Sequence, residues 1–334
     1  MKTIIVTGGA GYIGSHIVPV FARAGYNIIS LDLTPRCWDS DLHVSSYIVN
    51  LQHYDEIVKV LDSYSDIDGI IHCAGELGIE RSFSQKSLFY QQNVLTTDNL
   101  LCAAVRYKIK NFIFASSASV YADSSAPVTR DYYISAELSP YSMTKILSEE
   151  KIKSVANYIG LNYVIFRYFN VIGCDYEDKI SYYQYLQKPN LIPNMLKAYT
   201  KNECLFINGN NYHTKDGTCV RDYIDVRDLA ELHLKAYQAM VSDKWTSSLN
   251  GVYNAGSGRA YSVKDVCSML RQIVGQDIKH AICNMRLGDN PFLCANINYT
   301  EKIFNWRPRF SIKDTLESLL DKTETFYELH PTHN

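Results

Sequence analysis

The sequence predicts an α/β fold in which helices cover both faces of a doubly wound parallel sheet. Short apolar runs rich in β-branched residues alternate with helical segments through the first half of the chain, which is the pattern of successive βαβ units. The first of these runs, 3–6, is joined to a helical segment at 17–24 by a glycine-rich turn. A strand, a glycine-rich turn and a helix in this order are typical of a phosphate-binding junction.

The glycine-rich turn holds Gly8, Gly11 and Gly14 in the spacing G-x-x-G-x-x-G. Glycines there allow a sharp turn, a close approach of the backbone to a pyrophosphate, and tight packing of the helix on the strand. A second strand, 26–31, ends at Asp32, and an acid about 20 residues beyond the glycines binds the adenosine ribose. Together these features indicate a Rossmann-type site that prefers NAD to NADP, and they disfavour a plain tight turn.

The composition bounds the class of protein. The chain has 334 residues, 46% hydrophobic and 20% charged, with a formal net charge of −2; it is globular, and the lack of a basic block argues against a nucleic-acid partner. Nine cysteines occur without a CxxC pair, so we expect buried free thiols and no metal site. The first strand follows Met1-Lys2 directly and no long apolar window occurs, so we expect a cytoplasmic protein without a membrane span.

Periodicity assigns the remaining elements. We expect further strands at 47–49, 69–75, 111–115 and 162–167, a polar loop from 33 to about 46, and helices at 54–61, 93–107 and 141–158. After about residue 174 the alternation weakens, with strand-like pieces at 205–207 and 252–255 and a final helix near 312–327. We therefore expect a nucleotide-binding domain at 1–173, to which segments near 220–255 return, and a smaller mixed α/β substrate lobe at 174–334.

The candidate catalytic residues are Tyr141, Lys145 and Ser117. Tyr141 and Lys145 lie four residues apart, on one face of the helix expected at 141–158. A free phenol has a pKa of about 10, but a neighbouring ammonium and a cationic nicotinamide both favour the phenolate. As a phenolate, Tyr141 could act as a base that takes the proton of a substrate hydroxyl. Ser117 ends a strand and is placed to hydrogen-bond that hydroxyl. Alone, such a tyrosine–lysine pair is usually a solvated helix face, but downstream of a dinucleotide site it favours catalysis.

Several longer runs extend this pattern over nearly the whole chain. They lie at 7–16, 117–121, 141–145, 167–170, 216–218, 220–224, 228–230, 253–258 and 286–289. With these runs the chain resembles the extended short-chain dehydrogenase/reductase family, and within it the UDP-glucose 4-epimerase (UDP-galactose 4-epimerase) group. The opening runs are shared by the whole superfamily, whereas the later ones point to nucleotide-sugar binding.

The resemblance implies a tightly held NAD, a UDP-sugar substrate, and residue roles at the matching positions. The expected cofactor-binding residues are Gly8, Gly11, Tyr12, Ile13, Gly14, Asp32, Asn50, Leu51, Cys73, Ala74, Gly75, Asn93, Tyr141, Lys145 and Tyr168. The expected substrate-binding residues are Ser117, Tyr141, Phe169, Asn170, Asn190, Leu191, Phe206, Ile207, Arg221, Arg286, Asp289 and Leu293.

For the first part of the substrate the resemblance implies specific contacts. Asn170 is expected to bind the sugar diphosphate. Asn190 and Leu191 are expected to lie along the uridine diphosphate, and Phe206 and Ile207 to meet the uracil.

The resemblance also implies how the diphosphate and the sugar are held. Arg221 and Arg286 are expected to clamp the diphosphate, because a guanidinium offers a planar fork that is always charged. Asp289 is expected to accept a hydrogen bond from the uridine ribose. Leu293 falls at a position that walls the pocket beside the sugar 2-position, and its intermediate bulk is compatible with both plain and N-acetylated sugars.

The activity that the resemblance implies is a 4-epimerase interconverting UDP-glucose and UDP-galactose, with UDP-N-acetylglucosamine and UDP-N-acetylgalactosamine as a second substrate pair. Tyr141, helped by Ser117, would take the proton of the sugar 4-hydroxyl while the 4-hydrogen moves as hydride to the nicotinamide. The transient 4-keto sugar would then present its other face, and return of the hydride would invert the carbon.

Some positions depart from the family pattern, and other functions stay open. Asn50 stands where an aspartate usually contacts adenine, and Leu77 where a lysine often lies near the cofactor. Dehydratases carry an Asp-Glu pair where this chain has Ala118-Ser119, which disfavours water loss. The alternatives are an oxidoreductase that releases NADH in each cycle, and a non-catalytic NAD-binding protein. By the same resemblance, helices 93–107 and 141–158 would pair in a homodimer.

Overall fold

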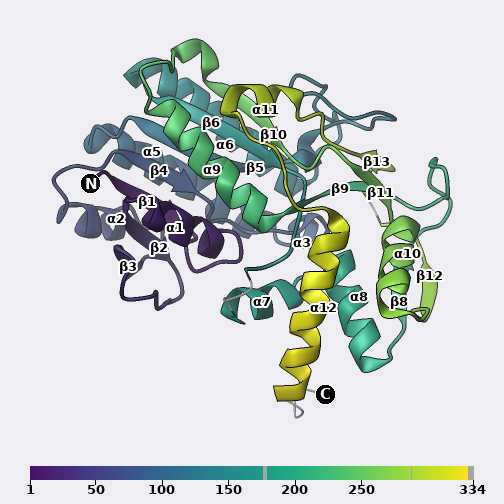
Figure 1. Cartoon of the computed structure of the whole chain (residues 1–334). Coiled ribbons are helices and arrows are strands. Elements are labelled where there is room, and N and C mark those ends of the chain that lie inside the picture. Colours follow the sequence, from purple (N-terminus) through teal and green to yellow (C-terminus); the bar gives the residue numbers. More distant parts are fainter. Residues whose placement is uncertain (176–178, 287, 330–334) are drawn as a thin grey trace.

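Seven parallel strands form the central sheet, in the spatial order β10-β6-β5-β4-β1-β2-β3 (Figure 1). They are β1 (Thr3–Thr7), β2 (Asn27–Asp32), β3 (Val44–Ile48), β4 (Gly69–His72), β5 (Asn111–Ser117), β6 (Asn162–Tyr168) and β10 (Gly251–Ala255). The computed structural model describes residues 1–175, 179–286 and 288–329. The strand order reverses between β1 and β4, and sheets of this kind bind ligands beyond the carboxyl ends of the strands at such a point.

Helices cover both faces of the sheet, and each layer closes over an apolar cluster. One layer holds α1 (Gly14–Arg23), α9 (Val226–Met240) and α11 (Asn298–Phe304), and the other holds α2 (Tyr54–Leu61), α5 (Thr96–Arg106) and α6 (Pro140–Ile159). In β1 the side chains of Ile4 and Val6 enter the first cluster and that of Ile5 enters the second, each with no exposed surface. Burial on both faces explains the continuous apolar runs in the sequence.

Helix α6 is fixed at both ends by its own sequence. Ser139 is the N-cap residue and accepts a hydrogen bond from the backbone N–H of Ser142 at 3.1 Å. Pro140 occupies the first helical position, where its missing N–H leaves no helix bond unmade. Gly160 ends the helix in the left-handed conformation, with φ of 71°. The start of the helix is thereby set one residue before Tyr141.

Short elements join these layers at the carboxyl edge of the sheet. Between β4 and α5 the chain forms α3 (Ile79–Ser84), α4 (Lys86–Phe89) and the π-helical segment η1 (Tyr90–Leu95). The 3-10 turn η2 (Ala118–Val120) follows β5 directly, and a second such turn, η3 (Ser247–Leu249), precedes β10.

Besides α9, α11 and β10, the second half of the chain adds two small sheets and four helices. The sheets are made of β7 (Asn170–Ile172), β9 (Val220–Asp225), β11 (Ala260–Ser262) and β13 (Phe292–Leu293), and of β8 (Leu205–Asn208) and β12 (His280–Cys283). The helices are α7 (Lys179–Leu186), α8 (Leu191–Lys201), α10 (Val263–Val274) and α12 (Ile312–Leu329), around a third apolar cluster (Figure 1). Tyr12 of the glycine-rich turn is buried in that cluster, so the turn joins the two parts.

The predicted fold class is confirmed, and three local predictions need correction. The loop expected up to residue 46 is wrong at its end, because β3 already pairs with β2 from Val44, and the strand stops at Ile48. This strand lies at the sheet edge with exposed and half-buried side chains, so it lacks an apolar run. The helix expected at 93–107 begins as the π-helical η1. The second half holds more helix than the weak alternation indicated.

The cysteines are all free, as predicted, but they are not all buried. The exposed ones are Cys37, Cys102, Cys204 and Cys283, and the fully buried ones are Cys174, Cys219 and Cys294. The expectation of uniformly buried thiols is therefore wrong, because Cys37 and Cys204 lie in loops and Cys102 and Cys283 lie on the outer surface of a helix and of a strand.

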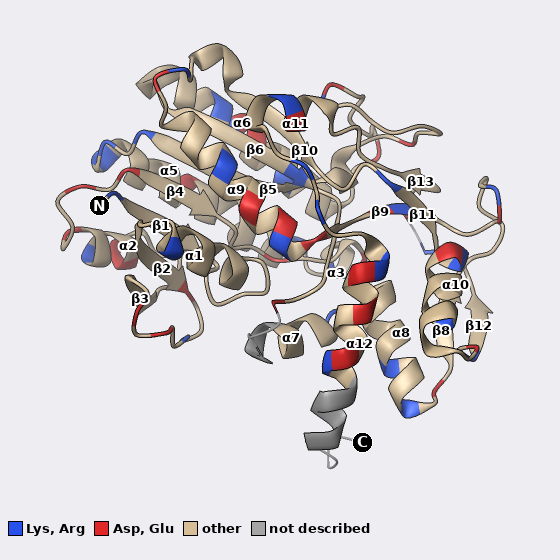
Figure 2. Cartoon of the chain, viewed as in Figure 1, with Lys and Arg blue, Asp and Glu red and all other residues tan. Residues whose placement is uncertain are grey.

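Acidic and basic side chains are interspersed along the ribbon, as Figure 2 shows for α9 and α12. Within residues 1–175, 179–286 and 288–329, no helix combines the length and the hydropathy that crossing a membrane requires. In the same ranges no three His, Cys, Asp or Glu side chains gather as a metal site would need.

Two buried histidines are held between the sheet and its helices. His72 ends β4, with Nδ1 2.7 Å from the Thr7 hydroxyl, and burial lowers the pKa of His72 to about 3. His233 lies on α9, with Nδ1 2.8 Å from the Leu229 carbonyl oxygen and Nε2 2.7 Å from the Tyr168 hydroxyl. Burial lowers the pKa of His233 to about 4. Both rings are therefore neutral at pH 7.

We expect His72 to make the stability of the fold depend on pH. An unfolded histidine takes up a proton below about pH 6.5, whereas His72 in the folded chain stays neutral until about pH 3. Between about pH 6.5 and pH 3 the free energy of unfolding should therefore fall as the pH falls, and His72 should account for about 1.4 kcal/mol of that fall per pH unit. A His72→Gln chain should lose that contribution, so urea unfolding at a series of pH values should give a shallower slope. Equal slopes for the two chains would contradict the assignment.

Candidate active site

Four neighbouring strands end together at the carboxyl edge of the sheet. β1 ends at Thr7, β4 at His72, β5 at Ser117 and β6 at Tyr168, and the parallel register sets Ser117 directly beside Tyr168. The segments that follow these strands carry most of the predicted cofactor residues. The sheet therefore brings residues that are far apart in the sequence to a single edge.

The glycine-rich turn leaves no room for side chains at two of its glycines. A Cβ on Gly14 would lie 2.1 Å from the carbonyl oxygen of Gly8, and one on Gly8, where φ is +67°, would lie 2.8 Å from the backbone nitrogen of Ala74. Asp32 braces the turn by accepting a hydrogen bond from the N–H of Ala10 at 3.0 Å. This close-packed backbone at the start of α1 fits a pyrophosphate, which needs accessible N–H groups and a helix N-terminus.

A buried chain of hydrogen bonds runs from this turn to α6, the helix that carries Tyr141 and Lys145. The His72 ring lies between the hydroxyls of Thr7 and Thr97, at 2.7 and 3.1 Å. Thr97 in turn donates to the backbone oxygen of Asn93 at 2.6 Å. The Asn93 amide donates to Thr144 of α6 at 2.9 Å. The strands β1 and β4 and the helices α5 and α6 are thus fixed to one another beneath the site.

Tyr141 and Lys145 are both buried and lie beside Ser117. Their exposed fractions are 7% and 4%. The Lys145 ammonium lies 5.9 Å from the centre of the Tyr141 ring and donates to the carbonyl oxygen of Ala115 at 2.9 Å. Burial raises the pKa of Tyr141 to about 12, and the Ser117 hydroxyl acts in the opposite direction. Burial lowers the pKa of Lys145 to about 8, so its side chain is mainly a cation at pH 7.

An ion pair holds α6 against the ends of β5 and β6. Glu149, one helical turn after Lys145, accepts from Arg167 Nε at 3.0 Å and from Arg167 Nη2 at 2.7 Å. The same carboxylate accepts from the Ser116 hydroxyl at 2.5 Å. Both charged side chains are at most 5% exposed. This pair was missed in the sequence, although Tyr141, Lys145 and Glu149 share one helix face at a spacing of four residues.

Several predicted cofactor residues have side chains that already make hydrogen bonds to other groups of the protein. The Tyr12 hydroxyl donates to the Gly173 carbonyl oxygen at 2.7 Å, so its side chain points away from the turn. The Asn93 amide oxygen already accepts from the N–H of Glu76 at 2.7 Å. Asn50 accepts from the N–H of Gln52 through its side-chain oxygen at 3.1 Å.

The other predicted cofactor residues line the strand ends. Ile13 precedes α1, Leu51 is buried in the turn after β3, and Cys73, Ala74 and Gly75 follow β4. Gly75 lies close to Lys145, because a Cβ built there would stand 3.7 Å from the ammonium. The Tyr168 hydroxyl lies against His233 of α9 at 2.7 Å.

The second half of the chain contributes a pair of charged side chains. Arg221 on β9 donates to the Asp289 carboxylate at 3.0 Å, with exposed side-chain fractions of 14% and 26%. The arginine and the aspartate that were given separate ligand roles are therefore partners in this structure. Arg286 lies beside Asn208, whose amide oxygen, turned toward the guanidinium, accepts from its Nε and Nη2 at 3.0 and 3.1 Å.

The side chains of Phe206 and Ile207, both expected to meet the uracil, point to opposite faces of β8. On β8 the Phe206 side chain is 64% exposed, whereas Ile207 is 3% exposed and belongs to the third apolar cluster. The Phe206 ring is therefore accessible from outside, whereas the Ile207 side chain is part of the core. Asn190 is exposed at the N-cap of α8, with Leu191 half-buried after it.

Asp222 ties β9 to two loops of the second half of the chain. This fully buried carboxylate accepts from the N–H of Ser257 at 2.6 Å, of Gly258 at 2.9 Å and of Ala295 at 3.1 Å. Asp222 directly follows Arg221, the residue expected to clamp the diphosphate, in β9. Sequence spacing gave no signal for this role, because the three donors come from two distant loops.

Leu293 and Phe169 belong to a small apolar cluster next to Ser117. Leu293 packs against buried Phe169, Ala118 and Tyr121, and it pairs in register with Arg221. Asn170 follows Phe169 at the start of β7. The residue expected to wall the sugar thus lies between the cluster at the strand end and the expected diphosphate clamp.

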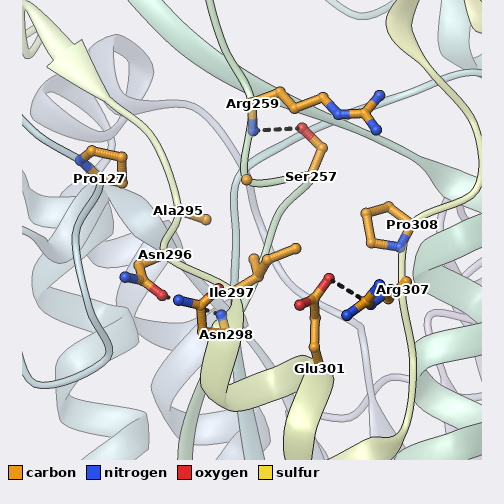
Figure 3. Close-up of a pocket in the computed structure, with 11 residues that line it drawn as sticks. Pro127, Ser257, Arg259, Ala295, Asn296, Ile297, Asn298, Glu301, Arg307 and Pro308 are labelled. Carbon is orange, nitrogen blue, oxygen red and sulfur yellow. Dashed lines mark hydrogen bonds and ion pairs between the residues drawn. The ribbon is translucent and has the colours of Figure 1, made fainter.

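A hollow of about 460 Å³ lies on another part of the surface (Figure 3). It is lined by Pro127, Ser257, Gly258, Arg259, Ala295, Asn296, Ile297, Asn298, Glu301, Arg307 and Pro308. None of the predicted site residues is among them. Its charged groups include an ion pair, with Arg307 Nε 3.6 Å from Glu301 Oε1. The hollow is therefore separate from the edge where the candidate catalytic residues meet.

Comparison with known proteins gives one consistent family. Residues 4–256 match the NAD dependent epimerase/dehydratase family. The UDP-glucose 4-epimerase of Halalkalibacterium halodurans is 31% identical over 329 residues, covering 98% of this chain and 96% of that protein.

Two solved structures are also similar to this chain in their three-dimensional fold. The UDP-glucose 4-epimerase of Bifidobacterium longum, in complex with NAD⁺ and UDP, has a TM-score of 0.84 at 28% identity and covers 99% of each chain. The UDP-Glc/GlcNAc 4-epimerase of Campylobacter jejuni has a TM-score of 0.79 at 27% identity and covers 97% of this chain and 100% of that one. This chain belongs to the NAD dependent epimerase/dehydratase family.

Proposed function

We propose that the protein is a UDP-sugar 4-epimerase that interconverts UDP-glucose and UDP-galactose, and also UDP-N-acetylglucosamine and UDP-N-acetylgalactosamine, through a transient 4-keto sugar. The observation that carries the proposal is the buried pair of Tyr141 and Lys145 beside Ser117 at the carboxyl edge. A solvated helix face would leave both side chains in water. The names of the relatives support the same activity.

The chain's own residues supply the proton chemistry in this proposal. Tyr141, as phenolate, takes the proton of the sugar 4-hydroxyl by way of Ser117, which accepts a hydrogen bond from that hydroxyl and gives its own hydrogen to the phenolate. Lys145 stabilises the phenolate by its charge. When bound, NAD would supply the two-electron acceptor and donor for the 4-hydrogen. The same tyrosine then gives its proton back to the inverted 4-oxygen, so no net proton is gained or lost.

In this proposal the cofactor and the UDP-sugar are bound by different regions of the chain. We assign cofactor binding to 1–173, with segments near 220–255, and UDP-sugar binding mainly to 174–334. Arg221 and Arg286 would hold the diphosphate, and the paired Asp289 would accept from the uridine ribose once the arginine turns to phosphate. The hexose must stay free to rotate, so it should have few charged contacts. Leu293 offers it an apolar wall.

The assembly and location in this proposal are a homodimer in the cytoplasm. Exposed apolar side chains on α5 and α6 support a dimer that pairs these helices. They include Val105, Met143 and Leu147, with exposed fractions of 49%, 44% and 36%. The free state of all nine cysteines fits a reducing compartment.

Replacing Tyr141 with phenylalanine should abolish most of the activity. The variant keeps the ring packed on Phe89, 6.1 Å away, but has no oxygen to take a proton, so kcat should fall about 10²- to 10⁴-fold. Turnover of UDP-galactose to UDP-glucose is measured with bound NAD quantified in each sample. Tyr158→Phe on the same helix, where the side chain is 90% exposed, is the matched control. A correctly folded, NAD-loaded Tyr141→Phe protein with native rates would refute the proposal.

Replacing Leu293 with tyrosine should narrow the range of substrates. A larger side chain at this wall should exclude the N-acetyl group, so turnover of UDP-N-acetylgalactosamine should fall about 10-fold or more. Turnover of UDP-galactose by the same variant is the internal control and should change little. If both substrates lose activity equally, or neither does, the assignment of this wall is wrong.

Replacing Gly14 with alanine should weaken retention of NAD. The new Cβ would stand 2.1 Å from the Gly8 carbonyl oxygen, so the turn must open at the point where a pyrophosphate would lie. NAD released by acid from the purified protein should drop relative to the unmodified chain. Gly251→Ala is the control, because its Cβ would meet nothing closer than the end of Arg130 at 3.5 Å. Equal NAD content in both variants would count against the assignment.

A further inference from the structure

Four serine hydroxyls form one continuous chain from the end of β5 to the start of α6. Ser117 Oγ lies 2.9 Å from Ser119 Oγ, Ser119 Oγ lies 2.9 Å from Ser142 Oγ, and Ser142 Oγ lies 2.9 Å from Ser139 Oγ. Ser142 is 1% exposed and Ser139 is 9% exposed. One end of this serine chain is the candidate catalytic serine, and the other is the N-cap of the catalytic helix.

The direction of the hydrogen bonds along the serine chain decides what Ser117 can do. Each hydroxyl gives one hydrogen and accepts up to two. When Ser142 donates to Ser119 Oγ, the Ser119 hydroxyl can donate in turn to Ser117 Oγ, which also accepts from the N–H of Ser119 at 3.2 Å. The hydrogen of Ser117 is then left free for another acceptor. When Ser142 donates instead to the Ser119 carbonyl oxygen at 3.0 Å, this direction is not enforced.

We propose that Ser142, acting through Ser119, is a positioning residue that turns the Ser117 hydroxyl toward the phenolic oxygen of Tyr141. The inference rests on the proposed function, because it gives Tyr141 the role of the base. Successive donors in a buried hydrogen-bond chain polarise one another, so Ser117 becomes a stronger donor. A donor to the phenolate favours the charged form. The chain keeps all its protons while the tyrosine exchanges one with the sugar.

The position of Ser142 makes it a clean site for a test. It directly follows Tyr141, and its backbone N–H, not its side chain, completes the helix cap with Ser139. An alanine at this position therefore keeps the cap and removes only the hydroxyl. The substitution also leaves the Asn93–Thr144 bond on the other side of the helix in place.

The other titratable groups around Tyr141 stay the same in such a variant. Lys145 comes from α6, Tyr168 from the end of β6, and Cys73 from the end of β4. Arg81 of α3, paired with Glu76, stacks over Phe89, whose ring packs on Tyr141. A shift in the ionisation of Tyr141 on removal of Ser142 would therefore come from the serine chain.

The test is the pH dependence of kcat in Ser142→Ala and Ser119→Ala enzymes carrying NAD. We expect the rising limb of the profile, which reports the Tyr141 phenolate, to move upward by about half to one pH unit, since one pKa unit is a factor of ten. At pH 7 kcat should fall about 3- to 10-fold, with KM little changed and the rate recovering at higher pH. Ser119→Thr retains a hydroxyl and should keep the native midpoint.

A control and a second readout separate this inference from the proposed function. Ser148→Ala removes another fully buried hydroxyl from α6 and should leave the midpoint in place even if the melting temperature drops. The Tyr141 titration is also followed without substrate, as the absorbance difference at the tyrosinate band between each protein and its Tyr141→Phe counterpart. Unshifted midpoints in both alanine variants overturn the inference. An unmodified enzyme that titrates as expected but epimerises no UDP-hexose overturns the proposed function instead.

Discussion

The buried ion pair between Glu149 and Arg167 is the interaction on which the arrangement of the site depends. It joins the middle of α6 to β6, and the Ser116 bond joins the same carboxylate to β5. Burying two charges costs desolvation energy that their attraction barely offsets, so such a pair is weak evidence for stability. Its consequence here is positional. With Glu149 fixed, Lys145 and Tyr141, which lie one and two helical turns before it, are held over the strand that ends in Ser117.

The region from the second half of the chain is positioned by a comparable buried carboxylate. Asp222 makes no ion pair with any residue that the structure describes, and it accepts hydrogen bonds from backbone N–H groups, the Ser257 hydroxyl and the Cys294 thiol. Burial raises the pKa of Asp222, and the hydrogen bonds from Ser257, Ala295 and Gly258 oppose that shift. Losing one donor would leave a buried charge undersolvated, so the two loops that supply the donors have little freedom to move. The expected clamp at Arg221 is therefore mounted on a rigid strand.

Part of this site could be predicted from the sequence, because its residues are separated by short, regular intervals. The glycines at 8, 11 and 14, the acid at 32, and the tyrosine–lysine pair are all separated by intervals that follow from strand and helix geometry. The central strands and α6 were readable for the same reason, because burial on both faces leaves long apolar runs. The edge strand β3 was misplaced since only one neighbour shields it. The bond between Ser119 and Ser142 and the donors to Asp222 join segments that are distant in the sequence, and no spacing rule connects them.

The electrostatics of the buried pair explain why the protein's own residues are not a sufficient base. With the pKa of Tyr141 raised to about 12 and that of Lys145 lowered to about 8, the combination at pH 7 is a neutral phenol beside a cation. Burial disfavours the phenolate more than the Ser117 hydroxyl favours it. A further positive charge close to the ring would reverse that balance, and the oxidised nicotinamide of a family that uses NAD carries one. Proton abstraction should therefore be coupled to the oxidised state of the cofactor. A site of this kind has its base ready only when it can also accept the hydride.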